Sequence, residues 1–270
     1  MVKFVLIFAV PFFLYFVIKT LLEKWSRKRK IARIPAEKDA KRWENIARIR
    51  DDWHEEYTTA LKQKSETPPT RKHAKPEIDK FLDVKRKTQI IIFDVETNGL
   101  SGNYSVLSCS AIKYEINPNT CEMTEIDRFN RYYYPVEQFD PQAIAVNGLT
   151  REVITVKRRD STYPEHFTAD DDFKNFCNGV VRFVAHNISF DMQFVPFISN
   201  KKRLCTMMTN MDIVAAGFLK WKNEWKWPKL SETAVHYGIQ FSESELHSSM
   251  ADAEITAKIF MKMLETARIS

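Results

Sequence analysis

The chain has 270 residues, of which 44% are hydrophobic. This length can hold one domain of about 180 residues with a sizeable core, together with an extension. The sequence contains no internal repeat, and its four cysteines show no C-x-x-C spacing, which excludes a repeat protein and argues against a cysteine-bound zinc site. The cysteines lie in apolar or mixed segments, which favours reduced thiols in a cytosol.

The net charge of +6 is unevenly distributed along the chain. Residues 1–88 hold 22 Lys and Arg against 12 acids, whereas residues 89–270 hold 19 against 23. The excess positive charge therefore belongs to the N-terminal part. A general basic patch for nucleic acid is not expected on the remainder.

The N-terminal part begins with an apolar stretch. A helix over residues 4–22 would rise about 28 Å, close to the thickness of the hydrocarbon core of a bilayer. The basic run at residues 24–30 predicts a single-pass anchor whose C-terminal side faces the cytosol, as in a bacterial-type inner membrane. A buried helix and a cleaved signal peptide are the alternatives. The position of the charge and the lack of a small-residue cleavage site disfavour the signal peptide.

A helical charge pattern over residues 36–64 precedes the breaker sequence Ser-Glu-Thr-Pro-Pro-Thr at residues 65–70. We therefore expect three parts. Residues 1–30 are predicted as a membrane anchor with a basic flank, residues 31–78 as a membrane-proximal helix and linker, and residues 79–270 as the main folded domain.

The domain is predicted to open with a buried strand at residues 89–95, which leads into two acids. The period of two places Asp94 and Glu96 on one face and Ile91, Phe93 and Val95 on the other. Burying two ionised carboxylates costs several kcal/mol per ion unless a cation offsets it. A strand that emerges into solvent at Asp94 is the alternative.

Further strands are expected near residues 105–115 and 121–134, and another at 180–185 that ends in a polar turn. A helix capped by Asn187 or Ser189 follows, with Asp191 in its first turn. Alone, Asp191 could simply complement the helix dipole. The tryptophans at positions 221, 225 and 227 favour packing, with stacking on bases as the alternative.

A C-terminal helix is predicted after His247. Ser249 and Asp252 fit a capping box, which would explain Asp252 without any chemistry. His247 would then be a loose residue before the cap.

Taken together, three segments resemble the motifs of the DnaQ-like DEDDh 3′-to-5′ exonucleases over roughly residues 88–267. Asp94 to Gly99 matches D-x-E-T-x-G, His186 to Asp191 matches H-N-x-x-F-D, and His247 to Asp252 matches H-x-x-x-A-D. Residues 142–150 are similar to a family element near the 3′ end of the bound strand, with Asn147 where histidine is common. The resemblance implies an α/β, ribonuclease H-like fold, in which a mixed sheet is flanked by helices, here preceded by the transmembrane helix.

By the same resemblance, Asp94, Glu96, Asp191 and Asp252 would hold two Mg²⁺ or Mn²⁺ ions, and His247 would act as general base. Oxygen-only ligation favours these ions over zinc. Substrate contacts are expected from the motif residues Thr97, Asn98, Gly99, Leu100, Asn147, His186, Asn187 and Phe190.

The sequence therefore predicts a membrane-anchored exonuclease that trims 3′ ends of single-stranded nucleic acid, with DNA slightly favoured. An exoribonuclease is the alternative within the family. The other alternative is a catalytically silent nucleic-acid-binding module, which the intact set of five residues disfavours. Only 18 residues follow Asp252, so no polymerase-binding tail is expected.

Overall fold

The computed structural model describes residues 74–82, 86–117, 119–219, 224–242 and 247–269. Within these ranges, no helix combines the length and the apolar character that a membrane crossing requires. The predicted anchor at residues 4–22 and the predicted helix at 36–64 lie outside the described residues.

Five strands form one mixed sheet in the order β3-β2-β1-β4-β5. Strands β1 (Thr88–Thr97), β2 (Val106–Ile116) and β3 (Met123–Tyr132) pair in antiparallel fashion. Strands β4 (Arg182–Ala185) and β5 (Lys202–Cys205) continue the sheet from β1 with parallel pairing. The predicted mixed sheet flanked by helices is confirmed, and β5 is a strand that sequence reasoning missed.

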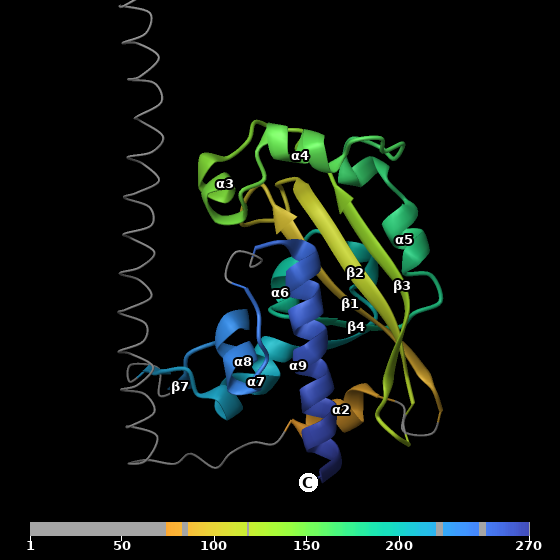
Figure 1. The fold of residues 1–270 in the computed structure, drawn as a ribbon, viewed down its shortest axis with the longest axis vertical. Helices are drawn as coiled ribbons and strands as arrows, with labels where there is room; N and C mark the ends of the chain where they lie inside the picture. The colour runs from red at the N-terminus through yellow and green to blue at the C-terminus, as the bar shows by residue number, and fades with distance from the viewer. Residues whose placement is uncertain (1–73, 83–85, 118, 220–223, 243–246, 270) are drawn as a thin grey trace, which may run out of the picture. The chain divides into compact units, whose positions relative to one another are not determined.

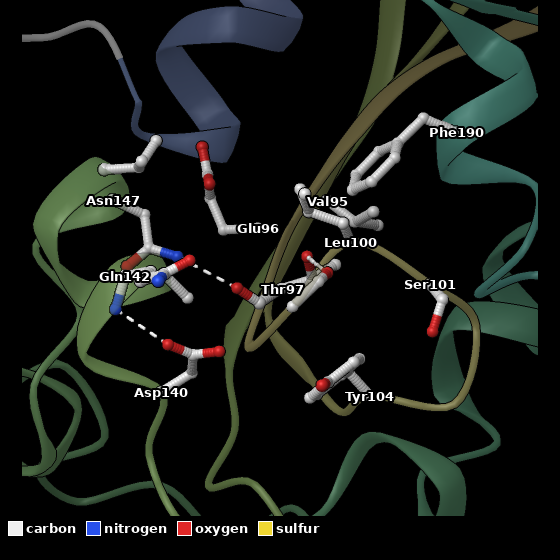
Figure 2. A pocket seen from close by; sticks show the side chains of 13 residues that line it. Val95, Glu96, Thr97, Leu100, Ser101, Tyr104, Asp140, Gln142, Asn147 and Phe190 are labelled. Atoms are coloured by element: carbon white, nitrogen blue, oxygen red, sulfur yellow. Dashed lines mark hydrogen bonds between the residues drawn. The ribbon is translucent and has the colours of Figure 1, made fainter.

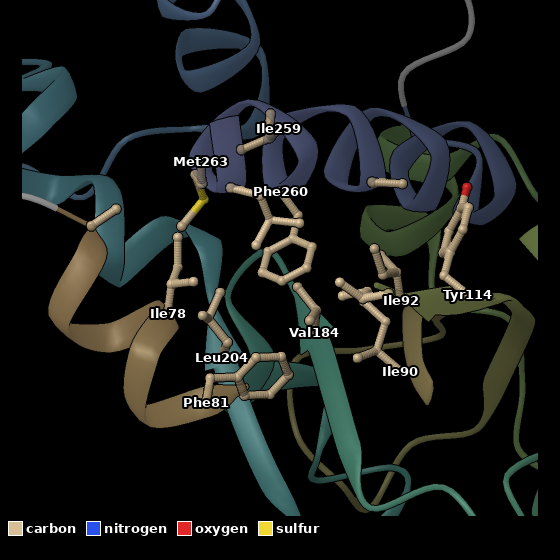
Figure 3. Close-up of a cluster of buried hydrophobic side chains, with 14 of the residues drawn as sticks. Ile78, Phe81, Ile90, Ile92, Tyr114, Val184, Leu204, Ile259, Phe260 and Met263 are labelled. Carbon is tan, nitrogen blue, oxygen red and sulfur yellow. The ribbon is translucent and has the colours of Figure 1, made fainter. Parts of the chain in front are cut away.

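Helix α9 (Ser249–Ile269) covers one face of the sheet, as Figure 1 shows. Helices α2 (Lys75–Phe81) and α8 (Leu230–His236) pack with it. Figure 3 shows the core beneath α9, where Ile90, Ile92 and Val184 of the sheet meet Phe260 and Met263 of the helix. Helix α2 spans the boundary predicted at residue 78, so residues 75–78 pack with the domain.

The opposite face of the sheet carries a second core. Ile91, Phe93 and Val95 of β1 point into it, as the period of two predicts. Helices α5 (Asp172–Phe176) and α6 (Ile188–Asp191) contribute Phe173 and Ile188 to it. Covering both faces explains why β1 reads as a continuous apolar run up to its two acids.

Helices α3 (Pro141–Asn147) and α4 (Arg151–Lys157) lie at the end of the sheet that α9 reaches with its N-terminus (Figure 1). Helix α7 (Thr206–Val214) follows β5 directly. A two-stranded sheet of β6 (Phe218–Leu219) and β7 (Glu224–Trp225) precedes α8. Single turns of 3₁₀-helix occur at Phe167–Ala169 and Pro196–Ile198.

Candidate active site

Two acids of β1 point toward the N-terminal end of α9. Asp94 and Glu96 are half-buried and lie opposite Ser110 and Ser108 of β2. Burial raises the pKa of Asp94 well above its ordinary range, and the charges of Asp191, Glu96 and Asp252 raise it further. The pKa of Glu96 is raised in the same way. Four carboxylates therefore repel one another in one place.

Asp191 reaches the site from α6. The N-cap residue before the helix is Asn187, which adopts the left-handed conformation with φ 69°. The backbone N–H of Val95 donates to Asp191 Oδ1 at 3.2 Å, which joins α6 to β1. Burial nevertheless raises the pKa of Asp191 to about 7. A helix-dipole role alone does not account for an acid this buried beside three others.

Asp252 lies in the first turn of α9. Burial raises its pKa to about 7, although the backbone N–H of His247 donates to its carboxylate. Its Oδ1 atom is buried and has no hydrogen-bond partner among the described residues. The capping-box interpretation is not supported, because the Ser249 hydroxyl bonds to those of Ser108 at 2.8 Å and Ser110 at 2.7 Å instead.

His247 completes the cluster at its exposed side. One carboxylate oxygen each from Glu96 and Asp252 and one ring nitrogen of His247 all lie within 4.8 Å of one another. The backbone of His247 is left-handed with φ 66°, a conformation that costs energy and concentrates at functional sites. Partial burial of the ring lowers the pKa of His247, and the charge of Lys229 lowers it further.

A cavity of about 630 Å³ opens beside Glu96. Figure 2 shows Leu100 and Phe190 on one side of it, with Asn147 and Gln142 across from them. Gly99 is required in its wall, because a Cβ atom there would lie 2.5 Å from the ring of Tyr104. Sequence reasoning missed the lining residues Ser101, Tyr104 and Asp140, whereas Gln142, Ala143 and Val146 belong to the segment at residues 142–150 that it indicated.

The family model described as an exonuclease, RNase T, matches residues 91–260. This chain belongs to that family. The match contains all four acids and His247, so the predicted membership among DnaQ-like exonucleases is confirmed.

Part of the chain is also similar to individual proteins and to a solved structure. The chain is 29% identical over 186 residues to a "DNA polymerase III PolC-type" of Staphylococcus haemolyticus, which covers 68% of this chain and 12% of that protein. A Staphylococcus aureus protein of the same name is 28% identical over 185 residues, which are 67% of this chain and 12% of that protein. The chain thus spans about an eighth of the curated relatives that it matches. Exonuclease I of E. coli in complex with a dT13 oligonucleotide has a TM-score of 0.50 at 17% identity, covering 67% of this chain and 42% of that one, which shows a shared fold.

Two motif residues that were predicted to contact substrate, Asn98 and Thr97, have hydrogen-bond partners within the domain. The buried Asn98 amide donates to Glu137 at 2.9 Å and to the Gln138 carbonyl at 2.8 Å, and its Oδ1 accepts from the Asp140 N–H. The Thr97 hydroxyl donates to the carbonyl of Gly99 at 2.7 Å, within the cavity wall. The side chains of Asn98 and Thr97 therefore shape the loop that forms the cavity.

His186 has a similar structural role. Its Nδ1 lies 3.0 Å from the Thr206 hydroxyl, and its Nε2 lies 3.0 Å from the carbonyl of Pro228. A carbonyl can only accept, so Nε2 carries the proton and Nδ1 is the unprotonated nitrogen of the neutral ring. Burial lowers the pKa of His186 to about 4, which keeps the ring neutral. His186 therefore links the end of β4 to α7 and to the segment before α8, and both of its ring nitrogens have partners within the domain.

The acid cluster fits divalent cations. Buried carboxylates with raised pKa values and an unpartnered buried oxygen need compensating positive charge, which hard cations supply to oxygen ligands. No basic side chain is paired with the four acids in the described part of the chain. The donor set therefore points to metal ions as the missing partner.

Proposed function

We propose that the chain is a 3′-to-5′ exonuclease that hydrolyses phosphodiester bonds at the 3′ ends of single-stranded DNA. The observation that carries the proposal is the convergence of Glu96, Asp252 and His247 atoms within 4.8 Å, with Asp94 and Asp191 beside them and a nucleotide-sized cavity next to Glu96. The intact set of acids argues against a catalytically silent module.

Asp94, Glu96, Asp191 and Asp252 would hold two Mg²⁺ or Mn²⁺ ions. Bound there, such ions stabilise the negative charge that develops on the attacking and leaving oxygens. The acids themselves hold the metal-binding oxygens in place on three elements: β1, α6 and α9. Ser249 and the Val95 N–H fix the helices that carry Asp252 and Asp191.

His247 serves as general base in this proposal. Its lowered pKa leaves the imidazole neutral at neutral pH, so a ring nitrogen can accept a proton from the attacking water. The side chain is exposed, so the accepted proton can pass to solvent. The backbone bond from His247 to Asp252 holds base and carboxylate at a fixed separation.

The cavity beside Glu96 suits the 3′-terminal nucleotide. Leu100, Val146 and Phe190 offer apolar surface for the base and sugar. Asn147 acts differently from a stacking histidine, because its Nδ2 donates to the Thr97 carbonyl at 3.1 Å and its amide also hydrogen-bonds Glu96. Asn147 therefore orients an acid and supports the cavity floor.

DNA is the favoured substrate because the curated relatives that we compared are named as DNA polymerases. Digesting end-labelled DNA and RNA strands side by side, with Mg²⁺ and with EDTA, tests the proposal. We expect Mg²⁺-dependent release of mononucleotides from a free 3′ end of DNA. A faster digestion of RNA would make the chain an exoribonuclease, and no release from either strand would contradict the proposed activity.

We also propose that residues 4–22 anchor this domain to a bacterial-type inner membrane, with the domain in the cytosol. The support is the apolar stretch followed by the basic run at residues 24–30. Deleting residues 1–30 should move the protein from the membrane fraction to the soluble fraction without loss of nuclease activity, because α2 begins only at residue 75. Recovery of the full-length protein in the soluble fraction would contradict the anchor.

A further inference from the structure

The segment at residues 226–229, between β7 and α8, is fixed by polar contacts on one side. Lys226 pairs with the buried Glu232 at 3.0 Å, and the backbone N–H of Lys229 donates to the same carboxylate at 2.5 Å. Between them, the carbonyl of Pro228 accepts from His186. These contacts set the backbone of the segment before any substrate arrives.

Two side chains of this segment point to solvent. Trp227 keeps 54% of its surface exposed, and Lys229 is also exposed, whereas Pro228 between them is buried. The backbone at Lys229 is extended, with φ −67° and ψ 162°. Trp225 behaves in the opposite way and packs against Phe218 with ring centroids 5.1 Å apart. The segment therefore offers an exposed indole and an exposed ammonium two residues apart, on a backbone that hydrogen bonds hold in place.

This exposed pair lies next to the acid cluster. Strand β4 pairs with β1 through Val184 and Ile92, and His186 and Asp94 each follow that pair by two residues along the chain. Pro228 is bonded to that histidine. The charge of Lys229 also acts on the imidazole of His247. Neither Trp227 nor Lys229 lines the cavity beside Glu96, so they form a separate surface.

We propose that Trp227 and Lys229 form a second nucleotide subsite, for the part of the strand on the 5′ side of the bond to be cut. A base stacks on the indole of Trp227, and a backbone phosphate contacts the ammonium of Lys229. Stacking on an aromatic ring tolerates any base, and one ammonium supplies local attraction in a domain whose net charge is negative. This inference rests on the proposed function, because it assumes that the same site acts on a polynucleotide strand.

Equilibrium binding tests the subsite without catalysis. The full chain, with Ca²⁺ in place of Mg²⁺, is titrated against a labelled single strand of about 10 nucleotides and against a nucleoside 5′-monophosphate, which fills only the first cavity. We expect Trp227→Ala to weaken binding of the strand roughly 5- to 100-fold relative to binding of the monophosphate. Trp227→Phe, which keeps an aromatic face, should restore most of the difference.

Lys229→Gln tests the phosphate contact independently. It should weaken binding of the strand and lower the slope of log K against log salt by about 0.7. The matched control is Lys174→Gln, which removes an exposed lysine of α5 and should leave both ligands unaffected. Melting curves of each variant confirm that the fold is intact.

The outcomes separate this subsite from the nuclease activity. Unchanged strand binding by Trp227→Ala, or an equal loss of both ligands, would overturn the subsite even if the wild type digests DNA. If Trp227→Ala selectively loses binding of the strand while the wild type digests neither DNA nor RNA, the subsite is supported and the proposed function is wrong.

Discussion

The contact between β1 and α9 has two halves that differ in chemistry although they share one strand face and one helix. In one half, Ile90 and Ile92 pack against Phe260 in a core closed to water. In the other half, Asp94 and Glu96 face Asp252. Apolar burial stabilises the first half, whereas burial of like charges opposes folding in the second. The apolar half therefore holds in place a set of acids that would not assemble by themselves.

Removing one acid should have the largest effect on function. Asp94→Ala is expected to reduce nuclease activity to background, because Asp94 lies among the other three acids, whose charges all act on it. The same change should raise the melting temperature of the metal-free protein, since it relieves repulsion between carboxylates. Asp127→Ala, at an exposed position of β3, is the control. Wild-type activity in Asp94→Ala would show that the acid half is not the catalytic site.

Removing the His247 side chain should have the second-largest effect on activity. His247→Ala is expected to lower the rate at saturating Mg²⁺ by roughly 10²–10⁴-fold, the range typical of a lost general base. In the wild type, the rate should rise with pH through a group whose pKa lies below the ordinary value for histidine and then level off, because only the neutral ring accepts a proton. His236→Ala, at an exposed position of α8, should change little. An unchanged rate in His247→Ala would leave the acids and remove this histidine from the mechanism.

A substitution in the apolar half should lower the stability of the fold. Phe260 is fully buried and meets the ring of Phe81 edge to face at 6.0 Å. Phe260→Ala should cost about 3–5 kcal/mol in the free energy of unfolding. Chemical denaturation measures the change, with Phe260→Leu as the conservative control. A loss below about 1 kcal/mol would contradict the assignment of this half as the main support of α9.

The smallest effect should be a pH dependence of the stability of the metal-free protein. The folded-state pKa values of Asp191 and Asp252 are about 7, above the ordinary range of an unfolded aspartate. At pH values between the unfolded-state pKa and the folded-state pKa, the folded state binds more protons than the unfolded state. The free energy of unfolding therefore falls as pH rises through this range. We expect a loss of at least about 1 kcal/mol from pH 5 to 8 in EDTA. Saturating Mg²⁺ should reduce this loss, and a metal-free stability that rises over the same range would contradict the burial of these acids.

The sequence was informative about functional residues whose position follows from a local pattern in the chain. The period of two predicted Asp94 and Glu96 on one face of β1, and the motif spacing indicated that His247 and Asp252 belong to the same site. It was uninformative about side chains whose partners are distant. Asn98 bonds to Glu137, 39 residues away, and His186 bonds to Pro228, 42 residues away. A motif names such residues without revealing whether they face the substrate or the fold.

The row of hydroxyls beneath the acids has a fixed direction of proton donation. Ser110 donates its single proton to Asn130 at 3.0 Å, so the bond between Ser110 and Ser249 must use the proton of Ser249. Ser108 must then donate to Ser249. Every proton of the row therefore points along it toward β3, and none is left for Glu96 or Asp94, which lie opposite Ser108 and Ser110 on β1. The serines anchor α9 without neutralising the carboxylates, which keeps the acid oxygens available to a cation.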